Sequence, residues 1–233
     1  MAIYLCPGYH SPALTDRFIE TLGLNQPQHS HPQTPENPGQ KNLSKSLNKP
    51  LNKKLIVFPS DRLPPYSPQA ILQYLRQSLD QFPDQSPDQA RRSPQTTSIT
   101  WIAFSAGVVG GILAARQWQQ AGYRVEKFIA IDGWGMPLGQ DFPIYRLSHD
   151  HWTHHSQTTI NHLLGSGIGD RPVASFIADP AVDHLSLWRS PDQVTGYLLN
   201  PQPPERSLTQ SQKHYAQKHC TAADCLQQWL PLS

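Results

Sequence analysis

The sequence has few cysteines, little excess charge and no long apolar run. Its 233 residues include three cysteines, an odd number that argues against a disulfide framework and favours reduced thiols. A net charge of +2, from 19 basic and 17 acidic residues, provides no basic face for nucleic acid. The N-terminal apolar run of about five residues is too short for a signal sequence or a membrane span. We therefore expect a cytoplasmic protein with no nucleic-acid partner and no membrane span.

Chain length and polar stretches indicate how the protein is organised. A chain of 233 residues is long enough for one large core, so we expect a single domain over residues 1–233. Two stretches, 25–53 and 83–97, are rich in Pro, Gln and Ser and hold few apolar residues. Such a composition buries too little apolar surface to fold alone, so we interpret both stretches as polar loop insertions.

Short β-type apolar runs alternate with amphipathic segments along most of the chain. Leu14, Phe18 and Leu22, for example, keep helical spacing after a Ser-Pro start. The alternation predicts a three-layer α/β/α fold, with helices on both faces of a mostly parallel sheet of about six strands. The predicted strands are residues 2–6, 55–58, 99–104, 125–131, 142–148 and 172–178, and predicted helices begin at Ser11, Ser67 and Ser105, with a polar helix near 156–165.

Two helical segments are predicted toward the end of the chain. Ser190-Pro191-Asp192-Gln193 matches both a Ser-Pro helix start and a capping box. It predicts a helix with Val194, Tyr197 and Leu198 on its buried side. Apolar residues within 225–230 predict a final helical turn that packs back on the body.

Ser105 stands where an apolar β-type run changes into a helix of small residues. The segment 101–115 reads Trp-Ile-Ala-Phe-Ser-Ala-Gly-Val-Val-Gly-Gly-Ile-Leu-Ala-Ala. Ala103 and Gly107, two residues to either side of the serine, are small, as a strained strand-to-helix turn requires. Such a turn exposes the hydroxyl, and the Ala106 backbone N–H at the helix start can face a developing oxyanion. The interior glycines of this helix also predict close packing on the sheet.

The order of the candidate residues resembles that of the α/β-hydrolase family. That family carries a nucleophile, an acid and a histidine in loops after successive strands, and this chain offers Ser105, Asp150 and His184 in that order. His184 also precedes a Ser-Pro helix start, which is similar to the family's histidine segment. In two respects the chain departs from the family. Ala103 replaces the first glycine of the Gly-x-Ser-x-Gly pattern, and two leading antiparallel strands are absent, so the fold would be a minimal version.

The resemblance implies a role for each of these residues. Ser105 would attack the substrate, His184 would act as the base, and Asp150 would orient the imidazole. Asp132 is the alternative acid, because some hydrolases of this fold carry the acid one strand earlier and Asp132 ends a stronger apolar run. Asp183, next to the histidine, offers a competing partner for a loop imidazole.

The resemblance also places a second oxyanion donor in the turn after the first strand. Tyr9, within Pro-Gly-Tyr-His at 7–10, would supply its N–H beside that of Ala106. A simple tight turn is the alternative interpretation. The functional prediction is a serine esterase or thioesterase that acts on an acyl substrate through an acyl-enzyme and uses no cofactor. An inactive hydrolase-fold binding protein, or an acyltransferase or lyase of the same fold, is the alternative.

Other motifs suggest other chemistry. Residues 149–155 contain four histidines and an aspartate, which invites a zinc interpretation. No second ligand cluster of defined spacing accompanies them, so we predict no metal site. A phosphate-binding turn at Ser105 is disfavoured, because neither a P-loop pattern nor a dinucleotide fingerprint occurs there. Trp134, Trp152 and Trp188 are candidates to line a pocket.

Overall fold

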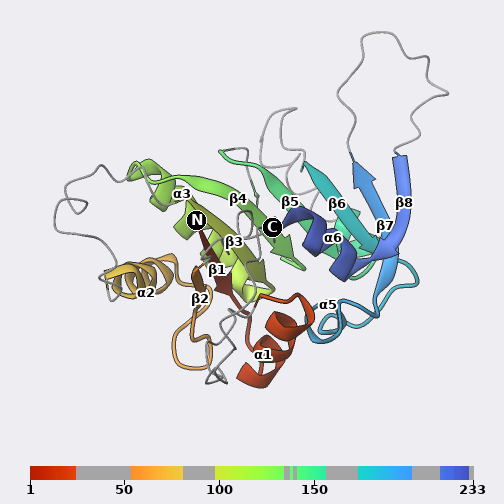
Figure 1. The fold of residues 1–233 in the computed structure, drawn as a ribbon, viewed down its shortest axis with the longest axis horizontal. Helices are drawn as coiled ribbons and strands as arrows, with labels where there is room; N and C mark the ends of the chain where they lie inside the picture. The colour runs from red at the N-terminus through yellow and green to blue at the C-terminus, as the bar shows by residue number, and fades with distance from the viewer. Residues whose placement is uncertain are drawn as a thin grey trace, which may run out of the picture.

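A computed structural model describes residues 1–24, 54–80, 98–133, 137–138, 141–155, 173–200 and 216–230. In this part of the chain, eight strands form one sheet with helices on both faces (Figure 1). The strands are β1 (Ala2–Cys6), β2 (Lys54–Val57), β3 (Ile99–Phe104), β4 (Val125–Ile131), β5 (Ile144–Ser148), β6 (Ala174–Ala178), β7 (Thr195–Asn200) and β8 (Ala216–Thr221). The helices are α1 (Pro12–Thr21), α2 (Pro68–Asp80), α3 (Ala106–Gln120), α5 (Ser186–Arg189) and α6 (Ala222–Trp229), with a short helix over 151–155.

The strand order across the sheet is β2-β1-β3-β4-β5-β6-β7-β8. Strands β1 to β6 are parallel, and β7 and β8 each run antiparallel to the strand before them. After β1, the chain adds β2 on one side of β1 and then β3 on the other side, so the direction of strand addition reverses at β1. Ligands of open parallel sheets bind at such a reversal, outside the carboxyl ends of the strands. Here that position lies between Pro7, which follows β1, and Ser105, which follows β3.

Alternating side chains divide the core between the two faces of the sheet. Tyr4 and Trp101 belong to the face covered by α2 and α3, and their rings meet edge to face at 4.9 Å. Leu5 and Phe104 belong to the face covered by α1, α5 and α6. A strand that is buried on both faces has a continuous apolar sequence, and all six residues of β3 are buried. The sheet therefore holds its central carboxyl ends rigidly.

The six expected strands are present in the structure, with bounds that differ by up to two residues. The helices expected after Ser11 and Ser67, and the helix after Ser105, are also present as α1, α2 and α3. Helix α6 confirms the predicted final helical turn, and its Cys225, Leu226 and Trp229 are buried. The stretches 25–53, 83–97 and 156–165 lie outside the described residues.

The prediction of a helix from Ser190 is wrong. Residues 190–193 form a turn, closed by a hydrogen bond from the Gln193 N–H to the Ser190 carbonyl, and strand β7 follows it. Burial alternates over Val194, Gly196 and Leu198, which is the period of a strand with one buried face. Pairing of β7 with β6 and β8 thus outweighed the local helix-start signal. Strands β7 and β8 raise the total from the expected six to eight.

Helix α3 packs as closely as its glycines predict. A Cβ added to Gly107 would lie 2.1 Å from the carbonyl oxygen of Cys6 at the end of β1. A Cβ added to Gly110 would lie 2.3 Å from the Pro65 carbonyl oxygen, in the loop before α2. Only glycine allows the backbone of α3 to approach both neighbours this closely.

Two expectations from composition can be compared with the structure. Cys6, Cys220 and Cys225 are free, although the Sγ atoms of the last two lie only 3.1 Å apart. None of the helices in the described part of the chain combines the length and apolar character needed to cross a bilayer.

Candidate functional site

Ser105 occupies a strained turn between β3 and α3. Its φ and ψ are 53° and −122°, in a region that non-glycine residues rarely adopt. The sheet ladder continues up to this residue, because the Ser105 N–H donates to the Ile131 carbonyl at 2.9 Å. The Ser105 carbonyl in turn accepts from the Val108 N–H at 2.9 Å, which starts the helix. The backbone on both sides therefore fixes the serine at the carboxyl edge of the sheet.

The turn after β1 lies against Ser105. A Cβ added to Gly8 would lie 3.0 Å from both the Phe104 carbonyl oxygen and the Ser105 Cβ. The Tyr9 side chain points out and is 62 % exposed, so any role of this residue at the site would belong to its backbone. Ala106 is the first residue of α3, and the first N–H groups of a helix have no partner within the helix. Both expected oxyanion donors thus lie in segments that border the serine.

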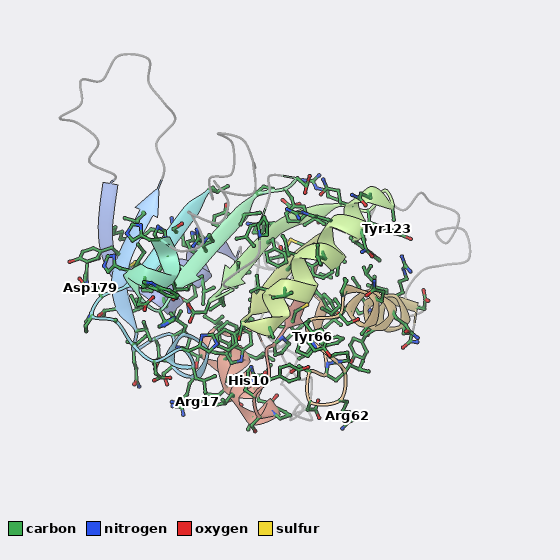
Figure 2. All side chains as sticks on the ribbon, turned by 180° about the vertical axis from the view of Figure 1, so that it is seen from behind. His10, Arg17, Arg62, Tyr66, Tyr123 and Asp179 are labelled. Atoms are coloured by element: carbon green, nitrogen blue, oxygen red, sulfur yellow. The ribbon has the colours of Figure 1, made fainter. Side chains whose placement is uncertain are left out.

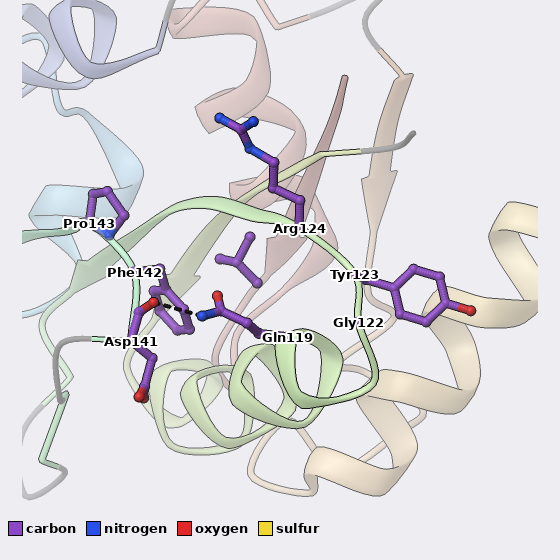
Figure 3. Close-up of a pocket in the computed structure, with 8 residues that line it drawn as sticks. Gln119, Gly122, Tyr123, Arg124, Asp141, Phe142 and Pro143 are labelled. Carbon is purple, nitrogen blue, oxygen red and sulfur yellow. Dashed lines mark hydrogen bonds between the residues drawn. The ribbon is translucent and has the colours of Figure 1, made fainter. Parts of the chain in front are cut away.

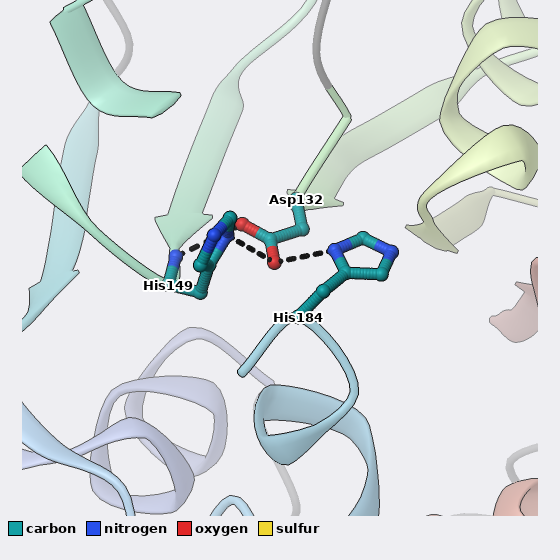
Figure 4. Close-up of side chains that lie close together, drawn as sticks. All are labelled: Asp132, His149 and His184. Atoms are coloured by element: carbon teal, nitrogen blue, oxygen red, sulfur yellow. Dashed lines mark hydrogen bonds and ion pairs between the residues drawn. The ribbon is translucent and has the colours of Figure 1, made fainter. Parts of the chain in front are cut away.

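Asp132 directly follows β4 and is the carboxylate that binds His184. Its Oδ2 lies 2.9 Å from His184 Nδ1 (Figure 4). The residue is buried, has φ of 53° like Ser105, and donates its N–H to the Leu147 carbonyl at 2.9 Å. Because an ionised carboxylate only accepts hydrogen bonds, the His184 ring donates from Nδ1 to Asp132, and in the neutral imidazole Nε2 is the acceptor nitrogen.

The expectation that Asp150 orients His184 needs correction. Asp150 Oδ1 instead accepts the Thr153 N–H at 2.7 Å and caps the short helix over 151–155. His149 and Asp150 both follow β5, which ends at Ser148, and it is His149 whose backbone N–H and ring lie against Asp132. The alternative acid, Asp132, is the residue that the structure brings to His184.

His149 is the member of this cluster that sequence reasoning missed. Its backbone N–H donates to Asp132 Oδ1 at 2.9 Å, and its Nδ1 lies 2.8 Å from Asp132 Oδ2. The second contact has the distance of an ion pair, but the ring is not aligned for a directed hydrogen bond. The available signal was a histidine at the end of a strand, in the position where the family resemblance expects an acid.

The two imidazoles keep the buried carboxylate ionised. Burial alone raises the pKa of Asp132, but the nearby His149 ring and the hydrogen bonds from His184 and the His149 backbone N–H outweigh this effect, so the pKa lies below its ordinary value. The close Asp132 carboxylate raises the pKa of His149 above its ordinary value, against the effect of partial burial. The cluster is therefore a carboxylate held between two histidines.

Stacked aromatic rings fix the position of His184. Its imidazole stacks on Phe104, the residue before Ser105, with ring centroids 4.8 Å apart and an interplanar angle of 22°. Phe104 also stacks on Trp188 at 5.1 Å, and Trp188 stacks on Phe18 of α1 at 3.8 Å. Trp188 is fully buried, so it is a core residue and not a pocket wall. Of the other two candidate tryptophans, Trp152 is 73 % exposed and Trp134 lies outside the described residues.

The loop that carries His184 is held by Asp183. The Asp183 carboxylate accepts hydrogen bonds from the Leu185 N–H and the Ser186 hydroxyl at the start of α5. It therefore fixes the turn and does not compete for the imidazole. Both Ser105 and His184 are described, and no hydrogen bond joins them in this structure. In enzymes without substrate, such contacts are often long and tighten only in the complex.

Asp132, His149 and His184 are also the group of described residues whose ligand atoms lie close enough to share a metal, within 4.8 Å of one another. Zinc ligands with bonds of about 2.0–2.1 Å lie roughly 3.3 Å apart in a tetrahedron. Both imidazole nitrogens lie closer than this to one oxygen, at 2.8 and 2.9 Å. The geometry fits a hydrogen-bonded carboxylate better than a set of metal ligands.

Among the described residues, two of the cavities lie at opposite ends of the strands. One of about 280 Å³ lies at the carboxyl ends of β1 and β2 and is lined by Pro7, Phe58 and Arg62 among others. One of about 470 Å³, lined by Tyr123, Arg124 and other residues, lies where β4 and β5 begin (Figure 3). Figure 2 shows Arg62 near the lower edge of the molecule and Tyr123 near the upper edge. Only the smaller cavity shares an edge with Ser105.

Neither a protein-family model nor a curated protein matches this chain. The resemblance to α/β-hydrolases therefore stays a prediction from the residues.

Proposed function

We propose that this chain is a serine hydrolase that cleaves an ester or thioester through an acyl-enzyme. Ser105 is the nucleophile, His184 the general base and Asp132 the acid that orients it. The observation that carries the proposal is the His184–Asp132 hydrogen bond of 2.9 Å, because it comes with an imidazole stacked on the residue before a strained serine. Acyl transfer by a serine enzyme needs three groups: a nucleophilic serine, a general base for its proton, and an acid that orients the base.

The proposed reaction proceeds in two halves. Ser105 Oγ bonds to the carbonyl carbon while His184 Nε2 takes its proton, and the carbonyl oxygen becomes an oxyanion. The N–H groups of Ala106 and Tyr9 stabilise this charge. The carbonyl then reforms, and the alcohol or thiol leaves with the proton from His184. A water molecule then attacks the acyl carbon while His184 takes its proton. The bond between Ser105 Oγ and the acyl carbon breaks as His184 returns the proton to Ser105, and the carboxylic acid leaves. Asp132 stabilises the imidazolium in both halves.

The cavity at the carboxyl ends of β1 and β2 is the proposed place for part of the substrate. It begins at Pro7, next to the turn that borders Ser105, and holds about 280 Å³. Its walls combine apolar rings with Asp16, Asp61 and Arg62. This size and polarity favour a short substrate group over a long acyl chain.

A fluorophosphonate probe tests the proposal, because it reacts with activated serines. We expect it to label the wild type and not Ser105→Ala, with circular dichroism to confirm that the variant folds. Ser148→Ala is the matched control, since Ser148 is also a serine at the carboxyl end of a central strand but is buried. Equal labelling of wild type and Ser105→Ala would reject Ser105 as the nucleophile.

A panel of acyl esters and thioesters then separates the alternatives. Hydrolysis of short-chain members supports the proposal. Labelling without hydrolysis would favour an acyltransferase or a lyase of the same fold. A protein inert toward the probe and every substrate would be a binding protein.

A further inference from the structure

Two cysteine thiols lie against each other near the C-terminus. Cys220 is in β8, Cys225 is in α6, and their Sγ atoms are 3.1 Å apart. The sulfur atoms of a disulfide are about 2.05 Å apart, so a movement of about 1 Å brings these two atoms to bonding distance. Neither thiol has a role in the proposed hydrolysis, so the pair is available for chemistry of its own.

The backbone that carries both thiols is held in place. Strand β8 pairs with β7 along its whole length. At the start of α6, Thr221 and Asp224 form a capping box, with hydrogen bonds of 3.0 and 3.1 Å. The Ala222 N–H also donates to the Val194 carbonyl at 2.8 Å, which joins the helix start to the segment before β7. The fold therefore brings the thiols together, and only their side chains must rotate to form a bond.

The two thiols differ in their access to solvent. Cys220 is half-buried in β8, the last strand of the sheet (Figure 1), whereas Cys225 is buried beneath it in the core. Burial and the neighbouring Cys220 thiol both raise the pKa of Cys225 above its ordinary value. Because the thiolate is the reactive form, an oxidant in solution meets Cys220 first.

We propose that Cys220 and Cys225 are a redox-active pair that forms a reversible disulfide, with Cys220 as the attacking thiol and Cys225 as the resolving thiol. The oxidant is a low-molecular-weight disulfide of the glutathione type. The bond ties the end of β8 to α6, whose Leu226 and Trp229 are part of the core. This inference is independent of the proposed function, because no step involves Ser105 or its substrate.

The reaction consists of two thiol–disulfide exchanges. The Cys220 thiolate attacks one sulfur of oxidised glutathione, whose S–S bond breaks, and one glutathione leaves with the electron pair and takes up a proton. The Cys225 thiolate then attacks Cys220 Sγ, and the second glutathione leaves in the same way. Two protein thiols are thus oxidised, and one disulfide is reduced to two thiols. Once Cys220 is in the mixed disulfide, its thiol no longer raises the pKa of Cys225, which favours the second exchange.

Incubation with mixtures of reduced and oxidised glutathione tests the proposal, followed by acid quenching, alkylation in denaturant and mass spectrometry. The C-terminal tryptic peptide, 219–233, contains both cysteines. In the oxidised wild type we expect this peptide without alkyl groups, without glutathione and lighter by two hydrogen atoms. Cys6→Ala is the matched control, because Cys6 is fully buried on the other face of the sheet and should leave the disulfide unchanged.

Single substitutions separate the two roles, with circular dichroism to confirm folding. Cys225→Ser lacks the resolving thiol and should keep glutathione on Cys220. Cys220→Ser should react at least about tenfold more slowly, because its remaining thiol of the pair is buried. A wild type that keeps glutathione on Cys220, a disulfide that includes Cys6, or a wild type that stays reduced in oxidised glutathione alone would overturn the inference.

Oxidation of the unfolded chain shows whether the fold or the short spacing brings the thiols together. We expect the equilibrium constant for oxidation by glutathione to be at least about tenfold larger in the folded protein than in concentrated urea. By linkage, the free energy of unfolding of the oxidised protein should then exceed that of the reduced protein by about 1.4 kcal/mol. Equal constants in the two states would overturn the inference, because the fold would then not favour the disulfide.

Discussion

The turn that carries Ser105 is built from neighbours in the sequence, whereas the Asp132 cluster joins residues that follow three different strands of the sheet. Around Ser105, small residues within two positions allow the strained backbone. Asp132 reaches His149 across 17 residues and His184 across 52. Local sterics therefore build one half of the candidate site, and the order of strands in the sheet builds the other. Substitutions should affect the two halves differently: loss of the long-range hydrogen bond should lower the labelling rate, whereas disturbing the local packing around Ser105 should lower stability.

The largest effect is expected from the acid. Asp132→Asn leaves the shape intact but can favour the wrong tautomer of His184, so we expect the labelling rate to fall about 10³–10⁴-fold. Asp150→Asn, the matched control at the end of the next strand, should lower the rate by less than about fivefold at pH 8, because Asp150 contacts His149 from a partly exposed position. A larger loss in Asp150→Asn than in Asp132→Asn would restore Asp150 as the acid.

The next largest effect is expected in the helix behind the serine. Gly107→Ala places a Cβ 2.1 Å from the Cys6 carbonyl oxygen, so the backbone must shift. We expect a loss of about 3 kcal/mol in the free energy of unfolding, measured by urea denaturation. In the same helix, a Cβ on Gly111 would make an ordinary contact of 3.4 Å with Ala103 Cβ. Gly111→Ala should therefore be neutral or more stable by up to about 1 kcal/mol. Equal stability of the two variants would contradict the close approach at Gly107.

A smaller effect is expected where the two halves meet. Phe104→Leu removes the ring on which His184 stacks, and we expect labelling to slow about three- to tenfold as the imidazole loses its support. Phe128→Leu removes an equally buried ring on the opposite face of the sheet. It should cost similar stability in thermal unfolding but leave the labelling rate unchanged. If both variants lose activity together, the stack has no specific role.

The smallest effect is the dependence of stability on pH. The pKa of His149 is raised on folding, so its stabilising contribution is complete below the unfolded value near 6.5 and is lost as pH rises through the folded value. Asp132, with its lowered pKa, stays ionised throughout this range. The difference in urea midpoint between wild type and His149→Phe should therefore be larger at pH 5.5 than at pH 8.5. A difference that grows with pH would contradict the sign of this coupling.

The same contrast explains what the sequence could predict. The first six strands, α1, α2, α3 and the strained Ser105 follow from apolar runs, Ser-Pro starts and small residues, all of which are local signals. The acid could be narrowed to Asp132 or Asp150, because both follow strands. Choosing between them required knowing how the chain turns after β5, where Asp150 caps the short helix over 151–155. His149 was missed for the same reason.

The C-terminal strands show that a local helix-start signal can also predict an element that does not form. Residues 190–193 carry a genuine helix-start pattern, yet they form a turn before β7. The pattern specifies how a helix would begin but not whether one continues. The edge of β6 gives Gly196 to Leu199 partners on the sheet, and burial of alternate residues on one face stabilises the strand instead.

Mapping the labelled residue tests the central claim most directly. Wild-type protein is treated with a fluorophosphonate, digested, and its modified peptide sequenced by mass spectrometry. The account predicts one adduct, on Ser105, that is lost in Ser105→Ala and forms about 10³–10⁴-fold more slowly in Asp132→Asn. An adduct on any other residue, or one on Ser105 that forms equally fast in Asp132→Asn, would contradict it.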